Sequence, residues 1–192
     1  MKNLNLIIAA LIFSFGFYSL NAQTYKLNNK ASEVVIDGTS NIHDWTMEAE
    51  SASGSLSAEF SDDMLEKISK LNFTVEAESL KSGKGGMDKN TYKALNTDDH
   101  KLITYQLQKV NDIKKLSDNS YKVSTTGSLE ISGTKKNIQL EFNLKTSPNK
   151  IILSGEKDLN MTDYGVDPPT AMFGTITTGE TVKIKFNTQF SI

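Results

Sequence analysis

The chain has 192 residues, a formal net charge of −2 and no cysteine. The missing cysteine excludes a disulfide framework, a thiol nucleophile and a lipid anchor on an N-terminal cysteine. The weakly acidic balance indicates neither a nucleic-acid partner nor an anionic membrane surface, and the absence of arginine disfavours the bidentate recognition of a phosphorylated ligand.

The first segment has the pattern of a secretory signal peptide. Lys2 precedes a nearly continuous apolar run over residues 4–20, and Asn21-Ala22-Gln23 follows it. We therefore predict a signal peptide at 1–22 with cleavage after Ala22, and a mature domain at 23–192 in the periplasm or outside the cell. The alternative is an uncleaved membrane anchor, since the run is nearly long enough to span a bilayer.

The next part of the chain predicts short strands separated by turns. Residues 25–38 contain a first strand, and 38–41 form a turn cluster. A second strand opens at Ile42, breaks at 53–54 and resumes as far as Phe60. A third runs over 71–78 with clean alternation of apolar and polar residues.

Residues 88–96 are the one segment with helical spacing. Asp88 is a good N-cap, and the segment follows a loop rich in glycine and lysine, so we predict a single short helix over an end or side of the sheet. A strand at 101–110 and a polar turn at 111–119 come next.

The clearest pattern lies between residues 121 and 145. Apolar and polar residues alternate on both sides of the turn 133–136, which predicts two antiparallel strands, each with one wet face. A further strand at 151–161, an irregular loop at 162–174 and a last strand at 182–192 complete the chain. Eight or nine strands at turn spacing predict an all-β barrel or sandwich.

One set of apolar side chains is expected to share the interior of this structure. From the residues alone, they either fill the interior or line a ligand-sized cavity. They are Leu71, Phe73, Val75, Ile103, Tyr105, Leu107, Leu129, Ile131, Leu140, Phe142, Ile184 and Phe186. Trp45, Tyr92 and Phe173 lie beside loops or the helix, where they either gate a mouth or pack in the ordinary way.

No pattern indicates catalysis, a metal or another cofactor. His43 and His100 are the only histidines, and a zinc site usually needs three protein ligands. His43-Asp44 is better explained as a strand edge beside a turn than as an oriented base. The acidic and amide residues between 158 and 167 lack the glycine and distal glutamate of an EF-hand, so they are assigned to turns.

Four stretches of the mature region resemble the YceI family of secreted bacterial proteins. The hairpin segment is similar to that family's G-x-L-x-I-x-G-x-T-K pattern, and Asp163-Tyr164-Gly165 is similar to its D-F/Y-G turn. The other two stretches are the small-residue segment 38–45 and the strand-to-helix transition 77–88. His43-Asp44-Trp45 and the Ala22-Gln23 junction are similar to the Bacteroidetes members.

The resemblance implies an eight-stranded antiparallel lipocalin-like barrel with one short helix. It implies a periplasmic carrier of a polyisoprenoid, an isoprenoid quinone or another long-chain lipid, with weak self-association left open. Many members have Arg-Asp before the helix, whereas this chain has Met87-Asp88. The alternative is an envelope stress or interaction protein whose barrel is filled by its own side chains.

Overall fold

The computed structural model describes residues 21–62 and 64–192. The predicted signal peptide therefore falls almost wholly outside the described residues, and only its last two residues, Asn21 and Ala22, belong to a described strand. Within the described ranges, no helix is long and apolar enough to cross a membrane.

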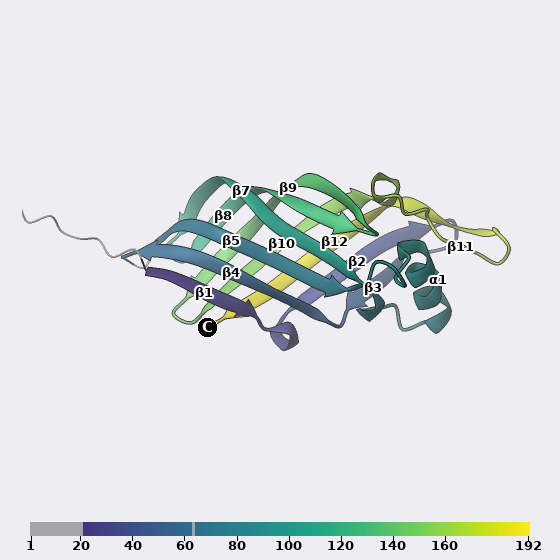
Figure 1. Cartoon of the computed structure of the whole chain (residues 1–192), viewed down its shortest axis with the longest axis horizontal. Helices are drawn as coiled ribbons and strands as arrows, with labels where there is room; N and C mark the ends of the chain where they lie inside the picture. The colour runs from purple at the N-terminus through teal and green to yellow at the C-terminus, as the bar shows by residue number, and fades with distance from the viewer. Residues whose placement is uncertain (1–20, 63) are drawn as a thin grey trace, which may run out of the picture.

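The described residues form mainly strands, with one α-helix and three short 3-10 turns (Figure 1). The strands are β1 (Asn21–Leu27), β2 (Glu33–Ser40), β3 (Trp45–Ala49), β4 (Ala52–Ser61), β5 (Met64–Glu76), β6 (Leu80–Lys81), β7 (Leu102–Ser117), β8 (Ser120–Ile131), β9 (Thr134–Ser147), β10 (Lys150–Asn160), β11 (Thr170–Ala171) and β12 (Ile176–Ser191). The helix α1 spans Gly85–Leu95, and the 3-10 turns are η1 (Asn29–Ala31), η2 (Ala77–Ser79) and η3 (Met161–Tyr164).

Eight strands form a closed ring in the order β1-β4-β5-β7-β8-β9-β10-β12, with every neighbouring pair antiparallel. The ring closes where β12 meets β1 through the pair Leu27↔Phe190. Closure removes the exposed edges that would invite pairing with another chain. The predicted fold class, an all-β lipocalin-like barrel of eight strands with one short helix, is confirmed.

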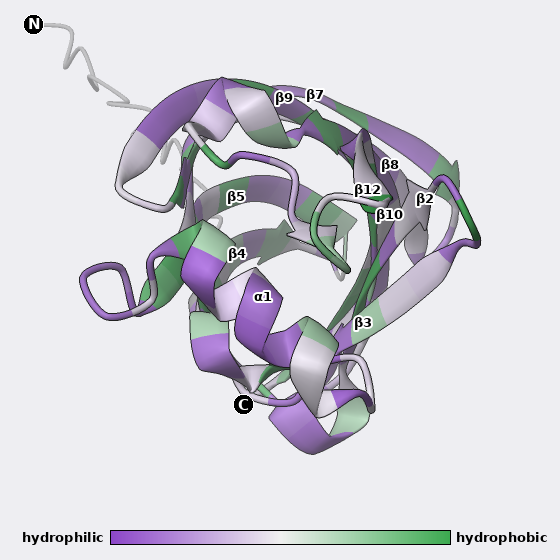
Figure 2. Cartoon of the chain, turned by 90° about the vertical axis from the view of Figure 1, so that its right-hand side faces the viewer, coloured by the Kyte–Doolittle hydropathy of each residue, from purple (hydrophilic) through white to green (hydrophobic). Residues whose placement is uncertain are grey.

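The ring is uneven because β12 pairs with different strands along its length. Its C-terminal end meets β1, whereas its N-terminal part pairs with β2. The short strands β3 and β6 continue the sheet from β2. The ring is thus widened at the end where α1, η3 and β11 lie, and Figure 2 looks into that end with α1 across the lower part of the opening.

The central hairpin is confirmed as β8 and β9. Their register runs without a break from Ser120↔Lys145 to Ile131↔Thr134. Ser132 and Gly133, the two turn residues, both have positive φ, of 48° and 74°. Two successive left-handed residues give the turn twist that matches a right-twisted hairpin.

Several strand boundaries differ from the sequence prediction. The segment 25–38 holds two strands, β1 and β2, separated by η1. The break predicted at 53–54 lies instead at 50–51, between β3 and β4. The polar turn predicted at 111–119 is wrong, because β7 continues to Ser117 against β8. Register shifts after Leu107 and Val110 explain this error, since each bulge resets the alternation of faces.

The helix also begins earlier than predicted, at Gly85 with Lys84 as its N-cap residue. Asp88 is not the cap. Its buried carboxylate accepts hydrogen bonds from the backbone N–H of Ser82 at 2.8 Å and from the Ser82 hydroxyl at 2.6 Å. Asp88 thereby fastens the first turn of α1 to the strand end that precedes it.

This contact makes the stability of the helix end dependent on pH. The hydrogen bond from the Ser82 hydroxyl, aided by the Ser82 N–H and the charge of Lys81, lowers the pKa of Asp88 against the opposing effect of burial. Because the folded pKa lies below the unfolded one, the stabilisation is complete above the ordinary pKa of an aspartate and is lost as pH falls through the folded value.

Asp88→Ala is therefore expected to lower the free energy of unfolding at neutral pH by about 1.5–3 kcal/mol. Urea unfolding at several pH values measures this difference, which should shrink towards the acid end. Asp98→Ala removes an exposed carboxylate just beyond α1 and serves as the control, with an expected effect within about 0.5 kcal/mol. A loss in Asp88→Ala that stays constant into acid would show that the carboxylate charge is not what stabilises the fold.

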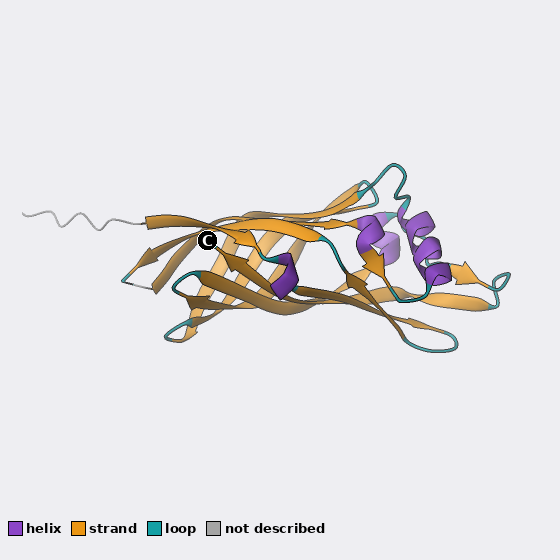
Figure 3. Ribbon diagram, turned by 90° about the horizontal axis from the view of Figure 1, so that it is seen from below, coloured by secondary structure: helices purple, strands orange, loops and turns teal. Residues whose placement is uncertain are grey.

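Apolar side chains inside the ring gather into two layers. At the end where β1 closes on β12, the layer includes Tyr25, Leu56, Leu144, Ile151 and Phe190, each at most 2 % exposed. The second layer lies beneath α1 and η3, the helical elements at the opposite end of the molecule (Figure 3). The five side chains named for the first layer are almost completely buried and fill the closed end, and the internal space begins where Phe142, Leu153 and Phe190 of the same layer border it.

Candidate functional site

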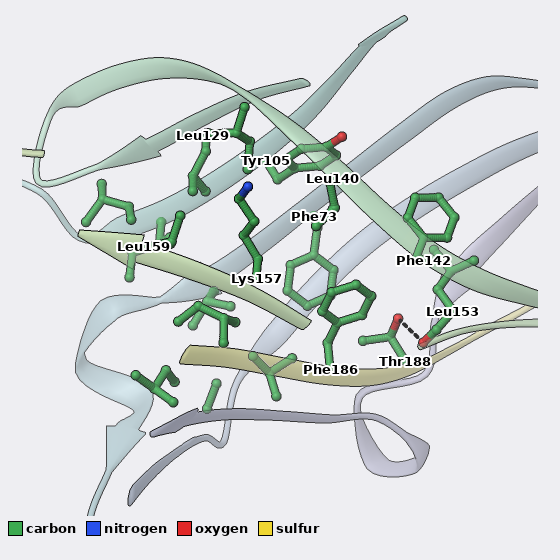
Figure 4. A pocket seen from close by; sticks show the side chains of 18 of the residues that line it. Phe73, Tyr105, Leu129, Leu140, Phe142, Leu153, Lys157, Leu159, Phe186 and Thr188 are labelled. Carbon is green, nitrogen blue, oxygen red and sulfur yellow. Dashed lines mark hydrogen bonds between the residues drawn. The ribbon is translucent and has the colours of Figure 1, made fainter. Parts of the chain in front are cut away.

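An apolar cavity of about 180 Å³ lies inside the ring (Figure 4), and Leu153 and Phe190 of the first layer border it. Its walls come from β2, β3, β5, β6, β7, β8, β9, β10 and β12. Nearly every lining group is aliphatic or aromatic. We call this space the inner cavity.

The predicted lumen residues converge on this inner cavity. All of them except Leu107 line it: Leu71, Phe73, Val75, Ile103, Tyr105, Leu129, Ile131, Leu140, Phe142, Ile184 and Phe186. Leu107 instead packs against the layer at the closed end. Whether the lining residues contact a ligand remains a prediction.

A larger cavity of about 550 Å³ lies beneath α1, between the β2–β3 loop, η3 and β11. We call it the outer cavity. It is within the ~300–1,000 Å³ range of ordinary ligand sites. Six apolar residues line both cavities: Ile36, Leu80, Ile103, Ile131, Leu159 and Ile184. The two cavities therefore lie next to each other, with these six apolar side chains, which we call the neck, between the inside of the ring and the space beneath the helix.

Of the three predicted mouth residues, Trp45 lines the outer cavity. Its indole N–H donates to the carbonyl oxygen of Thr39 at 3.0 Å, and its ring lies over Gly38. A Cβ at position 38 would approach the ring to 2.1 Å, so only glycine leaves room for this orientation. The local sequence thus fixes an aromatic wall at the mouth.

Tyr92 and Phe173 line neither cavity. The Tyr92 hydroxyl accepts a hydrogen bond from Lys81 Nζ at 2.6 Å and lies 3.0 Å from the carbonyl oxygen of Leu80, which ties α1 to β6. Phe173 is fully exposed in the turn between β11 and β12, with a φ of 56°. Tyr92 therefore holds the helix against β6, whereas the ring of Phe173 is exposed to solvent, and neither residue lies at the mouth of a cavity.

Phe173→Ser is therefore expected to leave the affinity for a fluorescent fatty acid, used as an apolar probe of the cavities, within about twofold and stability within about 0.5 kcal/mol of the unchanged protein. Equilibrium binding of a fluorescent fatty acid, together with thermal unfolding, measures both quantities. Trp45→Ser, which removes part of the outer cavity wall, provides the contrast and should weaken binding severalfold. A severalfold loss in Phe173→Ser would place its ring on the ligand.

Lys157 is a lining residue that the sequence reasoning missed. It lies on β10 opposite Ile184 of β12, and its ammonium group extends into the inner cavity towards Leu129 and Tyr105 (Figure 4). Its position was readable: it shares the odd-numbered phase of Ile151, Leu153 and Leu159, all of which face inward. The charge of the side chain obscured that pattern.

The other polar groups near the inner cavity already have partners. The Tyr105 hydroxyl lies 3.0 Å from the Thr125 hydroxyl, which donates to the Leu140 carbonyl oxygen at 3.0 Å. Burial raises the pKa of Tyr105, so its phenol stays neutral. The Thr188 hydroxyl bonds the carbonyl oxygen of Leu153 at 3.4 Å. Neither cavity wall includes an aspartate or a glutamate.

The described part of the chain contains no group of three or more histidine, aspartate or glutamate side chains that could hold a metal ion. His43 lies at the outer cavity, whereas His100 packs against Gly133 of the β8–β9 turn. The arrangement is that of a mainly apolar, partly open space, with the Lys157 ammonium group in the inner cavity close to Leu159 and Ile184, which line both cavities. Such a space can bury a long apolar molecule.

Comparison with known proteins agrees with this geometry. The model of the YceI-like domain matches residues 25–190. Among solved structures, BcnA of Burkholderia cenocepacia is 14 % identical with a TM-score of 0.66, covering 85 % of this chain and 98 % of its own. A polyisoprenoid binding domain from Saccharophagus degradans is also 14 % identical, with a TM-score of 0.65 and coverages of 87 % and 97 %.

The YceI protein of Campylobacter jejuni is 16 % identical with a TM-score of 0.57, and the match covers 74 % of this chain and 81 % of that one. No curated protein matches the chain. At these identities the structural matches establish a shared fold.

Proposed function

This chain belongs to the YceI-like domain family, and from that premise we propose that it binds a long apolar lipid, a polyisoprenoid or an isoprenoid quinone, inside the barrel. The observation that supports this most is the pair of adjoining apolar cavities, which open a path from the inner ring to α1. A related structure is that of a polyisoprenoid binding domain, which agrees with the proposal.

Burial supplies the binding energy. Each CH₂ withdrawn from water contributes about 0.8 kcal/mol, so an apolar chain gains affinity along its whole length with little polar contact. Ordering a flexible chain offsets part of that gain. Selectivity then follows from the length and shape of the path and from the few polar groups along it.

The role we propose is binding and transport, with no chemical step. The filled-barrel alternative has less support, because cavities of about 180 and 550 Å³ lie inside the ring and beneath α1. We also propose that the protein works in the periplasm or outside the cell, on the strength of the signal-peptide pattern in residues 1–22.

Mass spectrometry of the organic extract from the protein, purified from its native envelope without detergent, tests the proposal. We expect a stoichiometric long-chain lipid. A heat-denatured and refolded sample, extracted in the same way and then offered the same lipid, should bind it again. An empty extract, together with no thermal shift on adding isoprenoid lipids, would favour the filled-barrel alternative.

A further inference from the structure

Lys157 places a positive charge inside an otherwise apolar cavity, and this feature goes beyond a site for a neutral lipid. We propose that the ligand ends in an acidic oxygen group, a carboxylate or a phosphate, and that this group is bound inside the barrel by Lys157 Nζ. The inference rests on the proposed function and narrows it, because it selects lipids with an acidic head group over neutral ones such as the isoprenoid quinones.

The backbone of Lys157 is held on one side only, by β12, and this directs its side chain inward. Lys157 pairs with Ile184 of β12, and its neighbours along the inward face, Leu153 and Leu159, line the inner cavity with it. The ladder between β10 and β9 ends at Ser154↔Asn143. Lys157 therefore lies beyond the part of β10 that is held on both sides.

No group of the described residues neutralises this charge. Lys157 has no hydrogen-bond or ion-pair partner there, and the two acids beside it on β10 face outward. Lys183 Nζ lies 3.1 Å from Glu156 and 3.5 Å from Asp158, so both carboxylates are already engaged. Because the cavity walls include no acid, the partner of the ammonium has to come from the ligand or from water.

The apolar surroundings of the Lys157 ammonium group strengthen its interaction with an anionic partner. A charge pair gains more in an apolar, water-poor site than at an exposed surface, and an unpaired charge covered by hydrocarbon carries a large cost. A neutral chain that filled the inner cavity would cover the ammonium without replacing its water. A ligand with an anionic oxygen gains a charge-assisted hydrogen bond at the same place.

The sizes of the two cavities, together with the position of Lys157, favour one direction for the chain. The inner cavity, at about 180 Å³, is much smaller than the outer one, at about 550 Å³. With the head group at Lys157, most of the chain lies in the outer cavity and runs past the shared neck towards Trp45 and α1. The ligand thus enters head first.

Binding of three lipids with one common chain tests the head group. We expect oleic acid and oleyl phosphate to bind at least tenfold more tightly than oleyl alcohol at the same ionic strength, and Lys157→Met to remove that preference while leaving the affinity for the alcohol unchanged or higher. The relative affinity of oleic acid and oleyl phosphate then shows whether the site at Lys157 prefers a carboxylate or a phosphate. Lys150→Met is the matched control.

Lys150 is exposed at the start of β10 and lines neither cavity, so removal of its charge should change each affinity by less than about threefold. Equal affinity for the acid and the alcohol, unaffected by Lys157→Met, would overturn the inference while leaving the proposed function intact. Failure of all three lipids to bind would instead count against the proposed function itself.

The single tryptophan of the chain tests the direction. Trp45 lines the outer cavity and Lys157 the inner one. Stearic acid with a nitroxide at the far end of its chain should quench Trp45 fluorescence more strongly than stearic acid with the nitroxide beside its carboxylate. The reverse order would place the carboxylate at the mouth and contradict the assignment to Lys157.

Discussion

Leu144→Ala is expected to lower the free energy of unfolding by about 3–5 kcal/mol. Leu144 is fully buried on β9, opposite Tyr121 of β8 and Leu153 of β10, in the filled layer at the closed end of the ring. Its removal leaves a cavity that neighbours held in paired strands cannot collapse to fill. Equilibrium urea unfolding monitored by circular dichroism measures the loss.

Leu140→Ala, four residues away on the same face of β9, is the matched variant. Leu140 is only partly buried and already borders the inner cavity, so we expect a loss of less than about 2 kcal/mol. The contrast between the two leucines checks that one end of the barrel is filled and the other is hollow. Equal losses at both positions would mean that the interior is packed to the same density throughout.

Ala49→Phe is expected to weaken lipid binding by at least tenfold. Ala49 lies on the short strand β3 and lines the inner cavity, where a phenyl ring would occupy space that the ligand needs. Because the ring enters existing empty space, we expect thermal stability to be unchanged or slightly higher. Titration with a fluorescent fatty acid and a thermal melt measure the two effects separately.

Glu48→Phe adds the same ring to the neighbouring residue on the opposite face of β3. Glu48 is exposed, so this change should leave the affinity within about twofold of the unchanged protein. If both variants bound lipid normally, the inner cavity would have no part in binding. If both lost binding, the effect would come from disturbance of β3 and not from occupation of the cavity.

The alternation of apolar and polar residues along the strands supports most of the fold prediction. In the hairpin of β8 and β9 the period-two pattern is unbroken, so the strands, their turn and their inward face were all readable from the residues. The same rule brought together the apolar residues of β5, β7, β8, β9 and β12 that line the inner cavity. One inward face per strand is enough to define the interior of a closed ring.

The errors arise where a local pattern is reset or where tertiary contacts determine the structure. Bulges after Leu107 and Val110 shift the phase of β7, so its second half resembled a polar turn. Asp88 has the residue type of an N-cap, but its carboxylate is held by Ser82, and the helix begins three residues earlier. The local sequence does not distinguish an aspartate that caps a helix from one that accepts hydrogen bonds from the end of the preceding strand.

Lys157 was missed because a charged residue on the inward phase of a strand looks like an interruption of the pattern. Gly155 has the same inward phase, and a Cβ there would approach Phe186 to 2.8 Å. The two residues that break the apolar run of β10 thus have separate reasons: one makes room for an aromatic ring, and the other brings a charge into the cavity. The extent of the hollow end depends on long-range packing, which the sequence pattern does not specify.

A crystal structure of the protein with the lipid that copurifies from its native envelope tests the central claim most directly. We expect continuous density for one chain that begins beside Lys157, passes the neck at Ile103 and Leu159 and runs beneath α1 past Trp45. Cavities closed by side chains, or filled only by ordered water in a protein that retains no lipid, would contradict the account.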